Sequence, residues 1–241
     1  MAVTTAEKAP WQAEGAEKRE AVRAMFAKVA PHYDRVNSLM SLAMHRRWRA
    51  RAVKLLGLRI GERALDVCCG TGDFLVPLSR AVGSAGLAVG IDYCPQMLAL
   101  ARSKLPGSRL ALGDACALPV SSSSFDAVTV GWGLRNLADL DAGIAEMVRA
   151  LKPGGRFASL DMARPRNRIV RAVSGWVCGA LLPWIGSLFG SREAYTYLPK
   201  STERFASREE LTEAFERAGL IEVRWKDLMF GNICIHWGRK P

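Results

Sequence analysis

The chain has 241 residues, which suits one α/β domain with a small addition, and its 49% hydrophobic and 24% charged residues are those of an ordinary folded protein. Its 6 cysteines have no paired C-x-x-C spacing, which argues against a zinc site or a disulfide framework, so we expect no metal. The net charge of +11 limits the partners to anionic surfaces, either nucleic acid or the acidic inner leaflet of a membrane.

The N-terminal region is expected to be a tail followed by helices. Residues 1–20 are rich in Ala, Glu and Lys without a periodic apolar face, which predicts a loose tail. They have neither the charged-then-apolar pattern of a secretion signal nor the acid-poor composition of a transit peptide, so we place the protein in the cytoplasm. Residues 21–241 are expected to form one domain that opens with helices over residues 21–57.

Much of the positive charge is concentrated in two stretches of the chain. Their basic residues are Arg46, Arg47, Arg49, Arg51 and Lys54 in the first stretch, and Arg164, Arg166, Arg168 and Arg171 in the second. Each stretch indicates either a surface for an anionic partner or simply a solvated helix face, and the sequence leaves both interpretations open.

From residue 62 to residue 162 apolar runs alternate with helical patterns, as expected for βαβ units that feed a parallel sheet. The strands expected in this core cover residues 63–69, 87–91, 108–112, 125–130 and 156–161. Helices are expected up to Val82, from Pro95 and over residues 139–151, with a turn at residues 152–155. Residues 207–241 add a helix over 207–218 and strands near 221–228 and 232–237. The sequence therefore predicts an α/β fold with a doubly wound, mostly parallel sheet.

An apolar insertion is expected over residues 165–205. Residues 172–191 carry no charge, so a transmembrane helix has to be weighed. Four glycines and a proline interrupt this stretch, which favours short helices over one spanning helix; they are Gly175, Gly179, Pro183, Gly186 and Gly190. We therefore expect a helical lid that covers an apolar ligand and touches a membrane surface, with Trp176 and Trp184 among its substrate-binding residues.

A glycine-rich loop follows the first expected strand. Gly70 and Gly72, on either side of Thr71, let the backbone bend sharply and approach a ligand closely. Dinucleotide enzymes use a similar loop, so the two glycines alone are weak evidence. Here Leu75 takes the place of the third glycine, and Asp73 would repel a pyrophosphate but attract an ammonium group. These two details favour S-adenosylmethionine over a dinucleotide.

Two further carboxylates end the next two expected strands. Asp92 is placed to accept hydrogen bonds from ribose hydroxyls, and Asp114 to accept one from an adenine amino group, with the Ala115 N–H close to a ring nitrogen. Each aspartate alone would pass for a helix cap or a turn residue. Three acids at the carboxyl ends of three consecutive strands favour a ligand site, because open α/β sheets bind ligands there. We predict S-adenosylmethionine as the cofactor.

Three motifs outside the loop are specific enough to indicate a family. The first runs from Tyr33 to Trp48, and the second from Arg149 to Gly155, continuing to Ala163; the third is Gly133-Leu-Arg135-Asn136. With them, the chain resembles the quinone C-methyltransferases of ubiquinone, menaquinone and phylloquinone biosynthesis from about residue 20 to its end. It departs from the family pattern at a few positions, where Val36 replaces Met, Asp161 replaces Glu, Ala163 replaces Ser and Gly131 replaces Ser.

The resemblance implies a seven-stranded, Rossmann-like fold of class I S-adenosylmethionine methyltransferases. It implies cofactor contacts at Thr71, Asp92, Asp114 and Ala115, and a weaker one at Gly131, where only the backbone could replace the Ser hydroxyl. The loop Cys68-Cys-Gly-Thr-Gly72 and the run 131–136 look like the naphthoquinone branch of the family. The expected acceptor is therefore a prenylated demethylnaphthoquinol, either demethylmenaquinol or 2-phytyl-1,4-naphthoquinol. Methylation of a benzoquinol for ubiquinone, or of another small lipophilic acceptor, stays open.

Methyl transfer to a ring carbon requires an oxyanion on the reduced quinone, a cation to stabilise it and a group to receive the ring proton. Arg135 is our hypothesis for the charge role, against the alternative of a surface salt bridge. Tyr33 and His45 are candidates to relay the proton, although His45 also fits a satisfied structural histidine. Asn37 and Asn136 are candidates to orient the acceptor.

Three partner assignments complete the expectations. The run Gly131-Trp-Gly-Leu134 stands where base-amino methyltransferases carry Asp/Asn-Pro-Pro-aromatic, so no nucleic acid is expected. We expect peripheral attachment to the acidic inner face of the membrane where the quinol resides. The charge does not indicate whether two subunits pair, so a homodimer stays open.

Overall fold

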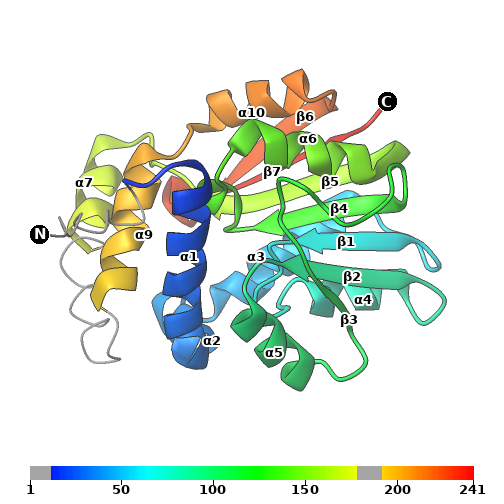
Figure 1. Cartoon of the computed structure of the whole chain (residues 1–241). Helices are drawn as coiled ribbons and strands as arrows, with labels where there is room; N and C mark the ends of the chain where they lie inside the picture. Colours follow the sequence, from blue (N-terminus) through cyan, green and yellow to red (C-terminus); the bar gives the residue numbers. More distant parts are fainter. Residues whose placement is uncertain (1–11, 178–191) are drawn as a thin grey trace, which may run out of the picture.

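The computed structural model describes residues 12–177 and 192–241, and these residues form a sheet of seven strands flanked by helices (Figure 1). The strand order is β3-β2-β1-β4-β5-β7-β6, in which β7 alone runs opposite to the other strands. The strands are β1 (Arg63–Val67), β2 (Leu87–Asp92), β3 (Arg109–Leu112), β4 (Phe125–Gly131), β5 (Leu151–Met162), β6 (Ile221–Leu228) and β7 (Ile233–Arg239). The predicted doubly wound, mostly parallel fold is confirmed.

Alternating side chains of the central strands divide the core into one layer on each face of the sheet. Leu65 and Val67 of β1 pack in a cluster with Phe157 and Phe215, whereas Ala64 packs in a second cluster with Trp48. This alternation follows from the two-residue period of a strand. The helices of the first face are α6 (Leu140–Ala150) and α10 (Arg208–Arg217), and those of the second are α3 (Met44–Leu56) and α4 (Leu75–Val82).

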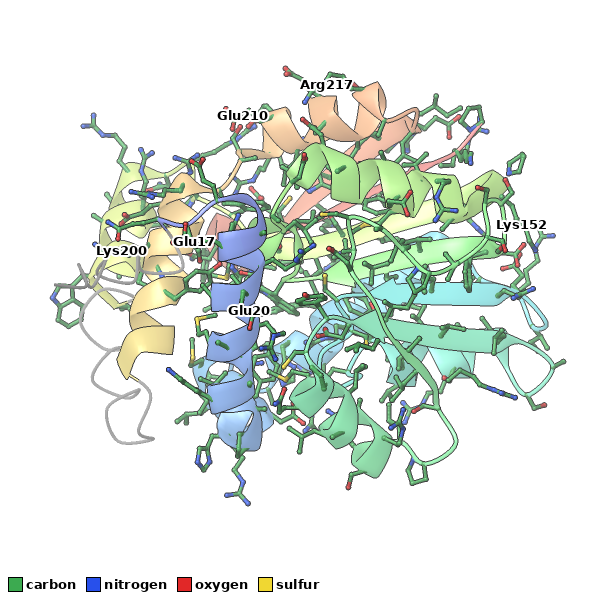
Figure 2. The ribbon with its side chains drawn as sticks, in the orientation of Figure 1. Glu17, Glu20, Lys152, Lys200, Glu210 and Arg217 are labelled. Carbon is green, nitrogen blue, oxygen red and sulfur yellow. The ribbon has the colours of Figure 1, made fainter. Side chains whose placement is uncertain are left out.

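The fifth strand begins earlier than the sequence predicted. We expected a turn at residues 152–155, but β5 starts at Leu151, which pairs with Phe125 before the register shifts and the ladder resumes at Arg156. Lys152 Nζ bonds both carboxylate oxygens of Asp126 at 2.8 and 2.9 Å. Figure 2 shows Lys152 at the side of the molecule opposite Glu17 and Glu20. This part of the second family motif therefore supports the sheet and lies away from the cavities described below.

The N-terminal segment is ordered from further upstream than expected. The predicted loose tail over residues 1–20 ends earlier, because α1 (Gly15–Val29) begins inside it. Helix formers such as Ala, Glu and Lys give this segment its propensity, and Val22, Met25 and Val29 supply a buried face beyond the tail. The helices that follow are η1 (Ala30–His32), α2 (Tyr33–Met40) and α5 (Pro95–Lys104), which contacts α1.

The region of the expected lid contributes two helices to the described structure. They are α7 (Arg168–Trp176) and α9 (Arg192–Arg204), and Figure 1 shows α9 next to α1 at one side of the sheet, with α7 beyond α9. Residues 178–191, including Trp184, lie outside the described residues. In the described part of the chain no helix combines the length and the apolar character needed to span a membrane. Two short 3-10 helices, η2 (Leu134–Asn136) and η4 (Met229–Gly231), complete the elements.

Candidate active site

The glycine loop after β1 forms the floor of a cavity at the carboxyl ends of the parallel strands. Gly70 lines this cavity with a φ of 54°, and a Cβ atom there would meet no atom within 4 Å, so its side chain would stand in open space. The Gly70 N–H donates to Asp92 Oδ2 at 2.7 Å, and the Cys94 N–H donates to Asp92 Oδ1 at 2.8 Å. The loop and the second strand are thereby held together, with bare backbone facing the cavity. We call this space the cofactor cavity.

Five of the seven residues predicted to bind the cofactor line the cofactor cavity. They are Gly70, Asp92, Asp114, Ala115 and Gly131. Burial raises the pKa of the Asp92 carboxyl, and the backbone N–H groups of Cys94 and Gly70 oppose that rise. Two carboxylates and exposed backbone fit a ligand with hydroxyl and amino groups. They do not fit a pyrophosphate, which the same carboxylates would repel.

Asp114 already has partners on both oxygens. Its Oδ1 accepts the Cys116 N–H at 2.9 Å, and its Oδ2 accepts from Arg19 of α1 at 2.6 Å. The Arg19 guanidinium also lies over the Tyr93 ring, 5.5 Å from its centroid. An adenine amino group that binds Asp114 Oδ2 would therefore compete with Arg19.

Thr71, Gly72 and Asp73 lie beside the cofactor cavity but do not line it. The Thr71 hydroxyl donates to Asp34 Oδ1 of α2 at 2.5 Å, which ties the loop to the N-terminal helices. The Asp73 carboxylate, which we expected to attract the ammonium group of the donor, accepts from Lys104 Nζ at 2.6 Å. Burial works to raise the pKa of Asp73, but Arg49 and Lys104 outweigh it and lower that pKa. Protein cations thus already neutralise this charge.

Gly131 has a specific packing reason for being glycine. A Cβ atom at this position would lie 2.6 Å from Phe74 Cε2, well inside van der Waals contact. The ring of Phe74 therefore takes the space in which the family's usual Ser would carry its side chain. Only the backbone of Gly131 faces the cofactor cavity, as the sequence indicated.

A second, larger cavity of about 560 Å³ adjoins the first, within the usual range for a small-molecule site. Four residues that the sequence marked for catalysis or acceptor binding line it together: Tyr33, Asn37, His45 and Arg135. The rest of the wall is mostly apolar, with α1, α2, α3, α7, η4 and β7 all contributing side chains. We call this space the acceptor cavity.

Three aromatic residues, Phe26, Tyr33 and Trp132, line both cavities and so form the boundary between them. The rings of Phe26 and Tyr33 meet edge to face at 6.1 Å. Burial raises the pKa of the Tyr33 phenol, while a hydrogen bond with Asn37 and the guanidinium groups of Arg49 and Arg135 work to lower it. The phenol at the boundary therefore lies within the field of two cations.

Arg135 forms a buried ion pair, not the surface salt bridge that the sequence left open as the alternative to a role in the site. Its Nη1 lies 2.5 Å from Asp161 Oδ1, and both side chains are almost fully buried. Burial raises the pKa of Asp161 and the Arg135 guanidinium opposes that rise. Arg135 Nε is buried without a hydrogen-bond partner. The arginine therefore has a fixed position in the wall of the acceptor cavity, and one of its donors is unused.

His45 is fully engaged by other protein groups. Its Nε2 lies 3.2 Å from Ser38 Oγ, and its Nδ1 lies 2.5 Å from Arg49 Nη1. Burial, with a further contribution from Arg49, lowers the pKa of His45 to about 4. The ring is thus neutral at physiological pH, which suits a positioning role better than a proton relay.

The remaining substrate-binding candidates are divided between the two cavities. Asn136 lines the cofactor cavity; its Nδ2 donates to the Trp132 carbonyl at 2.9 Å and its Oδ1 accepts from the Tyr197 hydroxyl at 2.7 Å. Tyr197, on α9, lines the acceptor cavity, so this bond joins the two. Trp176 does not line the described acceptor cavity, and it is 70% exposed on α7.

Sequence reasoning missed Arg49, Trp132 and Tyr197 of the acceptor cavity. Arg49 was counted in a basic surface run, but it is only 6% exposed. Its spacing of four residues from His45 would have indicated a shared helix face. Trp132 lies inside a recognised motif without an assigned role, and nothing in the sequence near Tyr197 marks it as facing a site.

Comparison with solved structures shows the fold. The chain aligns with a SAM-dependent methyltransferase from Thermotoga maritima at a TM-score of 0.68 and 20% identity, covering 90% of this chain and 99% of the other. A SAM-dependent methyltransferase from Aquifex aeolicus aligns at a TM-score of 0.58 and 20% identity, covering 80% and 89%. At such identities the likeness shows the fold, which is that of the class I methyltransferases.

Sequence comparison then defines the family. The model of the ubiE/COQ5 methyltransferase family matches residues 13–240. The demethylmenaquinone methyltransferases of Staphylococcus aureus strains JH9 and Newman are each 39% identical over 232 residues, covering 95% of this chain and 96% of theirs. The chain belongs to the ubiE/COQ5 methyltransferase family, and the predicted class of S-adenosylmethionine-dependent methyltransferase is confirmed.

Proposed function

We propose that this enzyme methylates a ring carbon of a prenylated demethylnaphthoquinol in menaquinone or phylloquinone biosynthesis. One observation carries the proposal: a buried arginine and a tyrosine, Arg135 and Tyr33, face a mostly apolar cavity that adjoins the cofactor cavity. An apolar cavity suits an aromatic ring with an isoprenoid tail, and the buried cation suits an oxyanion on that ring. The 39% identity to demethylmenaquinone methyltransferases supports the naphthoquinol as the ring.

The chemistry requires the quinol to become a carbon nucleophile. Loss of a hydroxyl proton gives an oxyanion that pushes electron density onto the neighbouring ring carbon. S-adenosylmethionine, when bound in the cofactor cavity, supplies a sulfonium methyl group to that carbon. Loss of the ring proton then restores the aromatic ring. The protein therefore has to hold the ring at the boundary of the two cavities, stabilise the oxyanion and let a proton leave.

Arg135 carries the electrostatic part of this task. A guanidinium does not readily give up a proton, so its role is to stabilise the oxyanion or orient a water molecule that takes the ring proton. Asp161 fixes the guanidinium through Nη1 at 2.5 Å, and the guanidinium lies in the wall of the acceptor cavity. Tyr33, bonded to Asn37, borders both cavities and serves to orient the ring or pass on its proton.

The cofactor residues retain the roles proposed from the sequence, with two differences. Asp92 and Asp114 receive the ribose hydroxyls and the adenine amino group, and Gly70 and Gly131 contribute bare backbone. Thr71 and Gly72 shape the loop, because Thr71 is bonded to Asp34 and Gly72 faces Leu105. Asn136, bonded to Tyr197, positions the boundary between the two cavities.

The test is a turnover assay with labelled S-adenosylmethionine and a panel of demethylated quinols, read by mass analysis of the products. We expect the label on a ring carbon of the prenylated naphthoquinol. Transfer to a benzoquinol alone, or to neither ring, would contradict the proposal. The benzoquinol result would redirect it to the ubiquinone branch.

The rim of the acceptor cavity supports contact with a membrane surface. Four of its lining residues are large apolar side chains that are exposed to solvent: Ile169, Val173, Met229 and Phe230. Phe230 is 86% exposed and has a φ of 56°, an unfavourable backbone conformation for a bulky residue. Arg168 and Arg171 flank Ile169 on α7 and are also exposed. An exposed apolar rim with basic neighbours suits the acidic inner leaflet, from which the quinol would enter.

This attachment is tested by flotation with anionic and zwitterionic lipid vesicles. We expect the wild type to float with anionic vesicles, and to do so less at high salt. The double variant Ile169→Ser/Phe230→Ser should lose most of this binding. Ile60→Ser is the matched control, because Ile60 is 78% exposed but lies in the loop before β1, outside both cavities. Equal flotation of all three proteins would contradict the proposed surface.

A further inference from the structure

One residue of the basic stretch on α3 is turned toward the interior of the protein. Arg46, Arg47 and Arg51 are exposed, whereas Arg49 is buried and shares its helix face with His45 and Trp48. Arg49 also lines the acceptor cavity. The basic stretch is therefore not one continuous surface. Arg49 lies in the wall of the acceptor cavity, whereas its basic neighbours lie on the solvated face of the helix.

The bonds of Arg49 differ from those of a buried arginine with a structural role. Arg208 places all three guanidinium nitrogens in hydrogen bonds, with Asp227 Oδ1 and the carbonyls of Arg164 and Gly231, at 2.5 to 2.7 Å. The hydrogen bonds of Arg49 to described residues all run through Nη1, to His45. Most of its N–H donors therefore remain for a ligand.

Arg49 shares its nearest carboxylate among the described residues, that of Asp73, with a lysine. Its Nη1 lies 3.5 Å from Asp73 Oδ2, while Lys104 Nζ bonds the other oxygen of that carboxylate at 2.6 Å. The Arg49 guanidinium also lies over the Trp132 ring, 4.6 Å from its centroid. A stack of this kind holds the plane of the cation without neutralising it.

Arg49 and Arg135 act on the same part of the acceptor cavity. Burial raises the pKa of the Tyr33 phenol, and both guanidinium groups oppose that rise. The neutral His45 accepts an N–H from Arg49 and so fixes its position without cancelling its charge. One mostly apolar cavity thus holds two cations, which a ligand with a single hydroxyl would leave partly unused.

We propose that Arg49 is the second cation of the acceptor site, and that Arg49 and Arg135 each donate to one of the two oxygens of a 1,4-dihydroxy aromatic ring. This rests on the proposed function and deepens it. The acceptor binds as a monoanion after one hydroxyl has given its proton to solvent. The second oxygen keeps its proton and accepts a hydrogen bond. Recognition then depends on both oxygens, and the enzyme selects a reduced quinol over a simple phenol.

The experiment is a double-mutant cycle in which one change is made in the protein and the other removes a hydroxyl from the acceptor. Wild type and Arg49→Gln are each assayed for kcat/KM with a short-tailed naphthohydroquinone and with its two monohydroxy analogues. We expect Arg49→Gln to lower kcat/KM for the dihydroxy ring by roughly 10- to 100-fold, the loss typical of a hydrogen bond to a charged group. With the analogue that lacks the oxygen bound by Arg49, the variant should lose less than about threefold. An equal loss with all three acceptors would overturn the assignment.

The pH profile separates this role from a purely structural one. The charge of Arg49 also stabilises the monoanion whose oxyanion binds Arg135, because both cations line one mostly apolar cavity. In Arg49→Gln the rise of kcat/KM with pH should therefore shift to higher pH, so that the defect shrinks as pH is raised. Arg49→Lys keeps a charge and should lose less than Arg49→Gln; it also serves if the Gln variant folds poorly. A defect that does not vary with pH would overturn the proposal.

Two controls separate the outcomes. Arg63→Gln removes an exposed arginine that lies over the Phe125 ring at 5.6 Å, outside both cavities, and should leave all rates unchanged. Affinity for S-adenosylhomocysteine should stay within about twofold in Arg49→Gln, because Lys104 still neutralises Asp73. If the wild type methylates no quinol, the proposed function fails. If it does and the cycle is additive, only the role of Arg49 fails.

Discussion

The two cavities meet at Tyr33 and Trp132, but they are built in different ways. The cofactor cavity is made largely of strand ends and loops between residues 68 and 138, closed by side chains of α1. The acceptor cavity draws on helices and on chain segments from residue 25 to residue 233. The first holds its ligand with backbone and short carboxylates whose places follow from the sheet. The second relies on long side chains, whose positions depend on how the helices pack.

The largest expected effect tests whether Arg135 acts on the acceptor and not on the cofactor. Arg135→Ala should lower turnover by ~100- to 1,000-fold, since a preorganised donor to a developing oxyanion is removed. Affinity for S-adenosylhomocysteine should be nearly unchanged, because Arg135 does not line the cofactor cavity. Because Asp161 would be left buried without its partner, the double variant with Asp161→Asn controls for lost stability. Wild-type turnover in Arg135→Ala would end this division of roles.

The converse change removes a carboxylate from the cofactor cavity. Asp92→Asn should weaken the binding of S-adenosylhomocysteine by ~10- to 100-fold, because hydrogen bonds to a charged acceptor are lost. The KM for the quinol should change little. Calorimetry measures the first quantity and initial rates the second. Asp126→Asn, which alters the carboxylate bonded to Lys152 away from both cavities, is the matched control. Unchanged affinity in a folded Asp92→Asn protein would refute the assignment.

A smaller effect tests how tightly the wall of the cofactor cavity is packed. Gly131→Ser should destabilise the protein by about 1–3 kcal/mol, since its Cβ would lie 2.6 Å from the Phe74 ring. The midpoint temperature of thermal unfolding should fall by ~2–4 °C for each kcal/mol of lost stability. Adding Phe74→Leu should recover part of the loss. A Gly131→Ser protein that unfolds at the wild-type temperature would show that the ring moves aside easily.

The buried carboxyl of Asp66, in the strand before the glycine loop, predicts how stability depends on pH. Burial raises its pKa to about 8, and Thr129 Oγ1 donates to its Oδ1 at 2.8 Å. The pKa of Asp66 is higher in the folded protein than in the unfolded chain, so its protonation stabilises the fold. This contribution to stability is fully present below pH ~4 and is lost as pH rises toward about 8. Asp66→Asn cannot ionise, so its urea midpoint should fall less between mildly acidic and mildly alkaline pH. Parallel pH profiles for the two proteins would contradict this.

The smallest expected effect concerns α1. Arg19→Ala should tighten the binding of S-adenosylhomocysteine by about two- to fivefold, because Arg19 occupies Asp114 Oδ2 through a partly exposed ion pair of modest strength. The gain should diminish as salt is added, since salt screens the competing pair. Calorimetry at low and high salt measures both. Weaker binding in the variant would mean that Arg19 contributes to the cofactor site.

The cofactor half could be predicted in detail because its order is local. Asp92 ends β2, and Gly70 and Asp114 come shortly after β1 and β3; parallel strands bring their carboxyl ends together at one edge. The exceptions have a tertiary cause. Asp73 was expected to face the donor, but Lys104 of α5 and Arg49 of α3 surround its carboxylate. Neither cation is close to Asp73 in sequence, so the pattern of residues could not indicate the pairing.

The sequence by itself determined the sheet, the loop and the family, because the two-residue period of strands and the glycine turn are encoded locally. It also marked Tyr33, His45 and Arg135, through motifs. Only the tertiary structure decided which basic residues are exposed and which are buried. Arg49 and its exposed neighbours are alike in sequence, and the contacts with Trp132 and His45 separate them. The residue type gives the charge of a side chain, but the environment of that charge depends on the packing of distant helices.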